Sequence, residues 1–362
     1  MSKSIHSPYY AFPTKVLAGA TEQFPRRDEP SMVEIDDGHF LFAYANHEGR
    51  SDNDTSNIAA MRISSEGDPV GEERILVAAP KGGLNAMSPA LRRLPDGRLG
   101  MVYSYRVSTK IAERHFRYSK DQGQTWSEPV IVATGNYKTG RHDSFTILST
   151  GRFLAPCHCA DDWDDHHLDV RVARSDDAGE SWTLSDPVEL PRVRWPEAVS
   201  TGWIESGCIE PFAAERSDGS VLMTLRTAMG TQFYSESFDG GELWSLPKSM
   251  EVISSIAPAH LTRLPGSDDL LLVWTSGFNV RESGMGLRHT ISACISKDGG
   301  LSWPHDRRRI VVHDTGQSND YPFVVYNGDE VWIIMRHSEG SGILSKAVSS
   351  ILMRVPLSWF YE

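Results

Sequence analysis

The chain is poor in cysteine, in positive charge and in long apolar runs. Its four cysteines, at positions 157, 159, 208 and 294, do not have the spacing of a secreted disulfide framework. No apolar run reaches transmembrane length, and the first ten residues lack the apolar core of a signal peptide. Together these absences favour a reduced, cytoplasmic protein, with a secreted protein as the alternative if a leader has been removed.

The charge balance excludes another group of functions. Lys and Arg total 36 against 48 Asp and Glu, which gives a formal net charge of −12. A chain this acidic is a poor ligand for nucleic acids and for anionic membrane surfaces, so neither is expected as a partner. Helical periodicity is nearly absent, while a hydrophobic content of 40% in 362 residues is enough to bury a large core. We therefore expect an all-β protein, whose oligomeric state the sequence leaves open.

A motif of the form S-x-D-x-G-x-x-W recurs four times. Its serines stand 56, 62 and 59 residues apart, and a repeat at such a period indicates one supersecondary unit used several times. The Ser and Asp side chains hold a turn through nearby backbone amides, Gly takes a positive φ, and Trp packs beneath. We interpret these turns as folding elements rather than as ligand sites. The copies span residues 119–126, 175–182, 237–244 and 296–303, and a decayed copy without its Trp begins at Ser64.

Between these turns lies a second periodic element, in which an apolar strand, a tight turn and a more apolar strand follow one another. Each copy is a β-hairpin signal in its own right. Six small antiparallel sheets of roughly 60 residues each cannot bury both faces alone, so they are expected to pack radially. The sequence therefore predicts a six-bladed β-propeller with Asp-box hairpins, as a single domain over residues 1–362, whose last blade is closed by residues 9–16. The six turn glycines are Gly38, Gly97, Gly151, Gly219, Gly266 and Gly328.

Propeller topology brings distant polar residues together at one end of the blades. If the hairpin glycines lie at one face, the starts of the first strands and the ends of the second strands lie at the other. Several arginines meet a few carboxylates and a tyrosine there. Guanidinium groups match planar carboxylates in two-point hydrogen bonds, so an anionic small ligand is expected. These residues are Arg26, Arg27, Arg50, Asp52, Asp54, Arg141, His142, Asp143, His158, Glu210, Arg226, Arg288, Asp320, Tyr321 and Arg336.

With these turns, hairpins and polar residues, the chain resembles the sialidase (neuraminidase) superfamily over essentially its whole length, in the bacterial branch with BNR/Asp-box repeats. Residues 210–226 are similar to the family segment that carries a glutamate and the second arginine of a triad, here Glu210 and Arg226. Arg288, upstream of the last box, resembles the third arginine. Tyr321 stands where the family's nucleophilic tyrosine precedes the final hairpin.

The remaining site residues come from the first blade and from other arginines. The family's first arginine usually sits in Arg-Ile-Pro, whereas residues 26–30 here read Arg-Arg-Asp-Glu-Pro, and Arg27 is the candidate. The acid aspartate is expected in the loop after the first hairpin, where we prefer Asp54 to Asp52. Arg50 and Arg336 are expected to bind substrate as well.

The resemblance implies a retaining exo-glycosidase that releases a terminal acidic sugar, such as a sialic acid, without a metal or other cofactor. Three arginines would bind the carboxylate on the anomeric carbon. That carboxylate would repel a carboxylate nucleophile by roughly 4 kcal/mol at about 4 Å and an effective dielectric of about 20, whereas a neutral tyrosine avoids this repulsion. Since a phenol has a pKa of about 10, Glu210 would take the proton of Tyr321. Asp54 would protonate the leaving oxygen and then deprotonate water.

Structural alternatives exist for each of these assignments. Glu210 and Arg226 could form an ion pair between strands, and Tyr321 could be an ordinary strand aromatic. Because a fold does not fix a substrate, a hydrolase or lyase acting on another acidic saccharide and a non-catalytic carbohydrate-binding propeller both stay open. Residues 157–169 are rich in Cys, His and Asp but match no zinc spacing, so we interpret them as a solvated acidic loop. Four aromatics in loops could stack on sugar faces or pack beneath the loops: Trp163, Trp195, Trp203 and Phe278.

Overall fold

The computed structural model is built almost entirely of β-strands. It describes residues 4–5, 9–161, 167–191, 207–277, 287–340 and 346–362. Within these ranges the helical segments are the short 3-10 turns Asp36–Gly38, His305–Arg307 and Leu357–Tyr361. No helix in this described part is long and apolar enough to span a bilayer.

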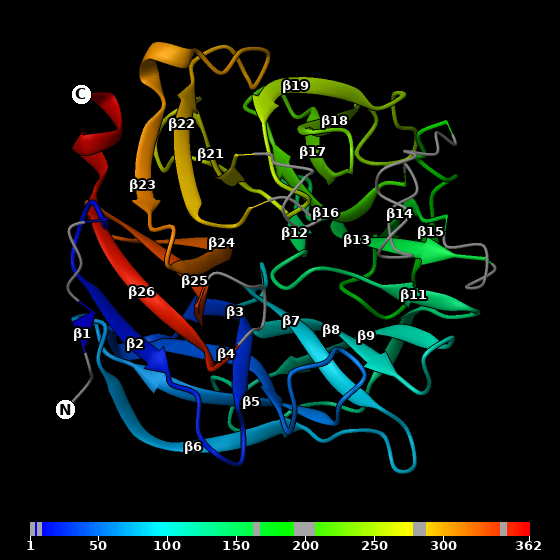
Figure 1. Ribbon diagram of the computed structural model, residues 1–362. Helices are drawn as coiled ribbons and strands as arrows, with labels where there is room; N and C mark the ends of the chain where they lie inside the picture. The colour runs from blue at the N-terminus through cyan, green and yellow to red at the C-terminus, as the bar shows by residue number, and fades with distance from the viewer. Residues whose placement is uncertain (1–3, 6–8, 162–166, 192–206, 278–286, 341–345) are drawn as a thin grey trace.

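The strands of the described residues form six antiparallel units of four strands each, arranged around a common centre (Figure 1). Each unit begins with one of the hairpins expected from the sequence, so the six-bladed β-propeller is confirmed. Blade one holds β3 (Arg26–Glu34), β4 (Phe40–His47), β5 (Ser56–Ile63) and β6 (Pro69–Val77), and blade two holds β7 (Asn85–Arg93), β8 (Leu99–Arg106), β9 (Ala112–Ser119) and β10 (Val130–Ala133). Blade three holds β12 (Thr146–Ile147), β13 (Phe153–Ala160), β14 (Asp169–Ser175) and β15 (Thr183–Leu184), with β11 (Tyr137–Thr139) between β9 and β13. Blade four holds β16 (Ile209–Glu215), β17 (Val221–Arg226), β18 (Thr231–Ser237) and β19 (Lys248–Ile253), and blade five holds β20 (His260–Arg263), β21 (Leu270–Ser276), β22 (Thr290–Ser296) and β23 (Arg309–His313). Blade six holds β24 (Gln317–Asn327), β25 (Glu330–Glu339), β26 (Val348–Pro356) and, from the start of the chain, β2 (Thr14–Ala18), which also pairs with β1 (Ser4–Ile5).

The N-terminal strand β2 closes the ring. It pairs antiparallel with β26, placing Thr14 opposite Met353, and Figure 1 shows the blue β2 beside the red β26. Tyr10 adds a bridge to Val312 of blade five. Of the segment 9–16 that was expected to close the last blade, residues 14–16 do so, whereas Tyr10 and Ala11 bond to the outer strand of blade five.

The hydrophobic core of the described residues is divided into clusters between neighbouring blades. Successive side chains of a strand point to opposite faces of its sheet. In β4, Phe42 and Tyr44 pack against blade six, whereas Leu41 and Ala43 face blade two. Because each blade is covered on both faces, a strand such as β4 is buried at every position.

The S-x-D-x-G-x-x-W turns hold neighbouring blades together. In the second copy, Ser175 Oγ donates to Asp177 at 2.8 Å and accepts from the Gly179 amide at 2.9 Å. A Cβ atom on Gly179 would lie 2.3 Å from the ring of Phe116 in blade two. Only glycine permits this approach, so the turn of blade three rests on a strand of blade two, the blade before it. The other close approaches are Gly67 on Leu352, Gly123 on Leu41, Gly241 on Leu154 and Gly300 on Leu222.

Replacing Gly179 by alanine tests this contact. Gly179 has φ +92°, and the ring it approaches packs against Phe145 and Phe153, so the core has little room to relax. We expect Gly179→Ala to lower the free energy of unfolding by about 2–4 kcal/mol in urea denaturation. Gly97→Ala is the matched control, because Gly97 has φ +86° but nothing within 4 Å of its added Cβ, and about 1 kcal/mol is expected there. Equal losses in the two variants would show that the contact between blades contributes nothing.

Candidate functional site

A pocket of about 420 Å³ lies where the first strands begin and the second strands end. Glu210 and Tyr321 reach it from the starts of β16 and β24, and Arg226 and Arg336 from β17 and β25. The loop between β4 and β5 contributes Asp52. The convergence expected from propeller topology is therefore present.

Four pocket residues share one backbone irregularity. Glu29, Ser88, Glu210 and Tyr321 each precede a proline in the first strand of a blade, with φ between 48° and 56°, where the strand register shifts. A non-glycine residue in this region costs about 1–2 kcal/mol, and a β-bulge redirects its side chain. All four side chains line the pocket. A residue-proline pair in the first strand of a blade, present in four of the six blades, is thus a sequence signal that could have identified Glu29 and Ser88.

Tyr321 and Glu210 meet in this pocket from different blades. The Tyr321 hydroxyl donates to Glu210 Oε1, and Arg226 Nη1 binds Glu210 Oε2 and lies 3.1 Å from the Tyr321 oxygen. Burial and the charge of Glu210 raise the pKa of Tyr321. Burial opposes ionisation of Glu210, but the charge of Arg226 outweighs it and lowers the pKa of this carboxyl. At neutral pH the pair is therefore a phenol hydrogen-bonded to a carboxylate.

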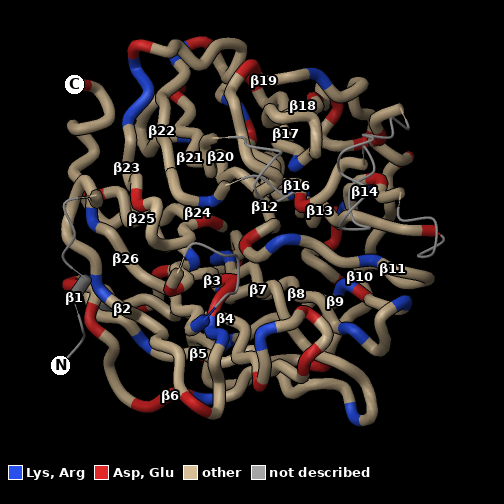
Figure 2. The backbone as a smooth tube through the Cα atoms, viewed as in Figure 1, with Lys and Arg blue, Asp and Glu red and all other residues tan. Residues whose placement is uncertain are grey.

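Two further arginines flank the ring of Tyr321. The guanidinium carbons of Arg336 and Arg288 lie 4.2 and 5.7 Å from the ring centroid. Asp320 positions both, because it accepts from Arg336 Nε and Nη2 and from Arg288 Nη1, at 2.6 Å each. Figure 2 shows acidic and basic residues side by side at the centre of the molecule, near β3 and β24. The site thus gathers Arg226, Arg288 and Arg336 around one phenol.

Arg27 is directed away from the pocket. It donates to the Gly19 carbonyl at 3.0 Å and contacts Tyr44 and Glu73, and it is not among the described residues that line the pocket. Because side chains alternate along β3, it is the preceding Arg26 that is buried and binds Asp28, at 2.8 Å. This placement corrects the expectation for Arg27. The third guanidinium beside Tyr321 is that of Arg336 in blade six, and not that of Arg27.

The loop between β4 and β5 reaches the pocket through a different aspartate from the one we preferred. Asp54 accepts from the Ser51 amide at 2.7 Å and so closes the turn of its own loop. Neither Asp54 nor the exposed Arg50 is among the described pocket residues. Asp52 does line the pocket, with Oδ1 2.5 Å from Arg26 Nη1. Partial burial opposes ionisation of Asp52, but Arg26 outweighs it and lowers the pKa of this carboxyl.

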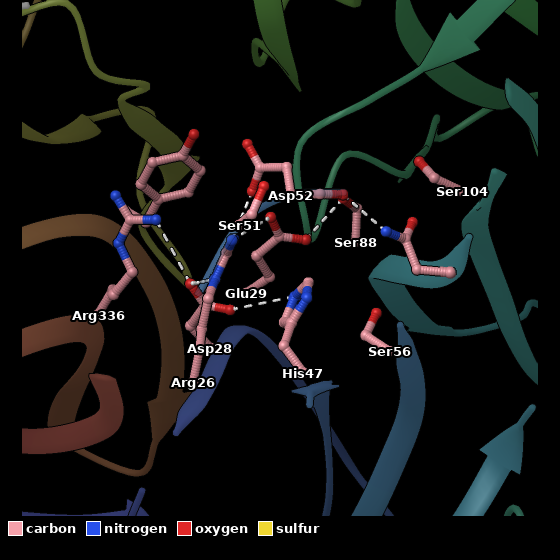
Figure 3. Close-up of polar contacts among 12 residues, drawn as sticks. Arg26, Asp28, Glu29, His47, Ser51, Asp52, Ser56, Ser88, Ser104 and Arg336 are labelled. Carbon is pink, nitrogen blue, oxygen red and sulfur yellow. Dashed lines mark hydrogen bonds and ion pairs between the residues drawn. The ribbon is translucent and has the colours of Figure 1, made fainter. Parts of the chain in front are cut away.

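Glu29 is a pocket residue that sequence reasoning missed. It is 5% exposed, and Figure 3 shows it between Arg26 and Ser88. Ser88 Oγ donates to Glu29 Oε2 at 2.7 Å, whereas Arg26 Nη2 is 3.4 Å from Oε1. Burial and the charge of Asp28 raise the pKa of Glu29 to about 8, although Arg26 and Ser88 oppose the shift. These shifts favour the protonated form of Glu29 near neutral pH.

The Cys-His-Asp segment at residues 157–169 lies partly outside the described residues, which omit 162–166. Cys157 and Cys159 are buried in β13, with their sulfur atoms 3.6 Å apart, so this end of the segment is a strand and not the solvated loop expected from the sequence. Among the described residues, no group of three or more His, Cys, Asp or Glu side chains could hold a metal ion. The aromatics considered for sugar stacking fall outside the described ranges: Trp163, Trp195, Trp203 and Phe278.

Comparisons with known proteins agree with this architecture. A family model described as a BNR repeat-like domain matches residues 35–333. The chain is similar to a protein of unknown function from Dyadobacter fermentans, with 19% identity, a TM-score of 0.71 and coverage of 96% of this chain and 100% of that one. It is also similar to the NanB sialidase from Streptococcus pneumoniae, with 10% identity, a TM-score of 0.73 and coverage of 98% and 71%. A third similar structure is the intramolecular trans-sialidase from Ruminococcus gnavus, with 13% identity, a TM-score of 0.71 and 97% of each chain covered. At these identities the likeness shows a shared fold, and no curated protein matches the sequence.

Asp320→Asn tests the carboxylate that holds two arginines of the site. Removing its charge leaves Arg288 and Arg336 buried without their shared partner, and we expect the free energy of unfolding to fall by about 3–5 kcal/mol at pH 7. Burial opposes ionisation of Asp320, but Arg336 and Arg288 outweigh it and lower its pKa. Its stabilisation is therefore complete above the ordinary Asp pKa of about 3.9 and is lost as pH falls below that value.

Urea denaturation at pH 7 and at pH 3 measures this effect, and the gap between wild type and Asp320→Asn should shrink at the lower pH. Asp68→Asn is the control. It breaks an exposed ion pair with Lys15 and should cost less than about 1 kcal/mol. If Asp320→Asn cost no more than this control, Asp320 would not be positioning the arginines.

Proposed function

The chain belongs to the BNR repeat-like domain family, and we propose that it is a retaining exo-glycosidase that releases a terminal acidic sugar of the sialic acid class. The observation that carries this proposal is the hydrogen bond from Tyr321 to Glu210 within a pocket that four arginines line. The sialidases among the similar structures support the same reaction class.

The arginines favour a substrate that carries a carboxylate. Four arginines line the described part of the pocket against three carboxyl groups, so cationic groups are in excess there. An anionic sugar would complement this excess, and the fixed guanidinium groups would orient its carboxylate by paired hydrogen bonds. A pocket of about 420 Å³ is of the size that proteins use for small ligands.

The nucleophile is Tyr321, activated by Glu210. As the Tyr321 oxygen attacks the anomeric carbon, the carboxylate of Glu210 takes the phenolic proton to which it is already hydrogen-bonded. Arg226 contacts both groups and stabilises negative charge as it passes from the carboxylate to the phenol. Water then attacks the anomeric carbon from the face that the leaving group left, opposite to Tyr321, and these two inversions give net retention of configuration.

The departing oxygen needs a proton from another group. Asp54 was expected to supply it but lies outside the described lining of the pocket. Two other carboxyl groups, Asp52 and Glu29, line the pocket on the blade-one side.

Kinetics on a fluorogenic sialoside test the assignment of the nucleophile. We expect Tyr321→Phe and Glu210→Gln each to lower kcat/KM by on the order of 10²-fold or more, because each removes a group that takes part in bond formation. Tyr326→Phe is the matched control, since Tyr326 is on the same strand but outside the described pocket lining. It should leave the rate within about twofold of wild type. Proton NMR of the first product formed should show retention of the anomeric configuration.

Three results would contradict the proposal in different ways. A wild-type protein that cleaves aryl uronides but no sialoside would act on another acidic saccharide. A protein inert on every acidic glycoside, with sugar binding unchanged in Tyr321→Phe, would be a non-catalytic carbohydrate-binding propeller. Inversion at the anomeric carbon would exclude Tyr321 as a covalent nucleophile.

A further inference from the structure

We propose that Glu29 is the general acid of this site, a role that rests on the proposed glycosidase function. The carboxyl group would donate its proton to the glycosidic oxygen as the bond to the anomeric carbon breaks. Glu29 lines the same pocket as Tyr321 and Glu210.

The position of Glu29 in its blade is equivalent to that of the two groups assigned to nucleophilic attack. Glu29, Glu210 and Tyr321 each occupy the residue before proline at the bulge of a first strand, with φ of 56°, 48° and 52°. Blade one and blade four lie across the ring from each other in a six-bladed propeller. Glu29 therefore approaches the pocket from the side facing Glu210, and both side chains line it.

The two glutamates differ in how closely an arginine approaches the carboxyl group. Glu210 binds Arg226 directly, whereas Glu29 has one neutral hydroxyl partner at 2.7 Å and a long 3.4 Å approach to a guanidinium. Burial also raises the pKa of Glu29. Two carboxyl groups whose environments separate them in this way divide into an acid and a base. The titratable, charged and hydrogen-bonding groups around Glu29, taken from each neighbouring element, are Arg26, Asp28, Asp52, Ser88, Arg114 and Tyr137.

Asp52 is the competing candidate, and its contacts favour the ionised form. Arg26 Nη1 lies 2.5 Å from Asp52 Oδ1, and this pairing lowers the pKa of Asp52. The same guanidinium reaches Asp28 through Nε at 2.8 Å. The closest contacts of Arg26 are therefore with Asp52 and Asp28. Of the three carboxyl groups, Glu29 is the one whose charged form Arg26 stabilises least.

The proposed step balances. Glu29 supplies the proton of its own carboxyl group. This proton passes to the glycosidic oxygen, the C–O bond breaks and the alcohol leaves, while Tyr321 forms the new bond to the anomeric carbon. Glu29, now a carboxylate, then takes a proton from the water that attacks this carbon, and the phenolate of Tyr321 recovers its own proton from Glu210.

The leaving-group dependence of the full-length protein tests this role. Two glycosides of one sialic acid are compared, an alkyl glycoside whose leaving alcohol needs a proton and a 4-nitrophenyl glycoside that needs much less help. We expect Glu29→Gln to lower kcat/KM on the alkyl substrate by on the order of 10²-fold or more and on the aryl substrate by less than about tenfold. Asp52→Asn is the matched control and should lower both rates by a similar factor.

The pH dependence gives a second measurement. A general acid works while protonated, so activity on the alkyl substrate should fall as pH rises through the pKa of Glu29, and this alkaline limb should be absent in Glu29→Gln. Ser88→Ala keeps the carboxyl but removes the hydrogen bond that favours its charged form. The alkaline limb should then move to higher pH. Ser88→Ala still tests the proposal if thermal melting shows that Glu29→Gln does not fold. Independently of turnover, the infrared C=O band of a protonated carboxyl at pH 7 should be lost in Glu29→Gln.

Each outcome decides between the two proposals. A wild-type protein inert on both glycosides overturns the glycosidase function and the role of Glu29 with it. A wild-type protein active on both, with an unchanged rate ratio in Glu29→Gln or an unmoved alkaline limb in Ser88→Ala, overturns the role of Glu29 alone. A selective loss on the alkyl substrate in Asp52→Asn assigns the acid to Asp52.

Discussion

The close approach between each glycine turn and the strand of the preceding blade is the constraint on which the ring depends. A blade has two apolar faces, and both are buried only when neighbouring blades lie against it at a fixed spacing. Gly67, Gly123, Gly179, Gly241 and Gly300 set this spacing where the turns meet their neighbours. The geometry of the pocket depends on the same contacts, because its residues come from several blades that are far apart along the chain.

The charged groups of the pocket are organised as buried pairs rather than as free charges. Asp320 fixes Arg288 and Arg336, and Glu210 fixes Arg226. Removing such groups from water is costly, so the pairs define the geometry of the site more than they add to stability. A ligand then meets arginines that are already oriented, which reduces the reorganisation required as charge shifts during a reaction.

The periodicity of the sequence was enough to predict the blades. The prediction of site residues was wrong where a bulge or a loop sets the direction of a single side chain. The hairpin glycines and the repeated turns were sufficient for the six blades, and topology then placed Glu210, Arg226, Arg288, Tyr321 and Arg336 at one end. The choices of Arg27 over Arg26 and of Asp54 over Asp52 required the orientation of a side chain in a bulged strand and in a loop, which residue types do not encode. Glu29 was missed for a related reason. Its carboxyl reaches the pocket because the strand slips register before Pro30, and its proton depends on burial and on Asp28, both of which are properties of the assembled ring.

The pairing of β2 with β26 has a consequence for biosynthesis. Blade six carries Tyr321 and Arg336, and its outer strand consists of Thr14–Ala18. A ribosome therefore releases most of the blades before the segment that completes the site exists, and the early strand must wait for a partner made more than 300 residues later. Such a long-range closure is slow to form, and the ring stays open at least until β26 has been synthesised.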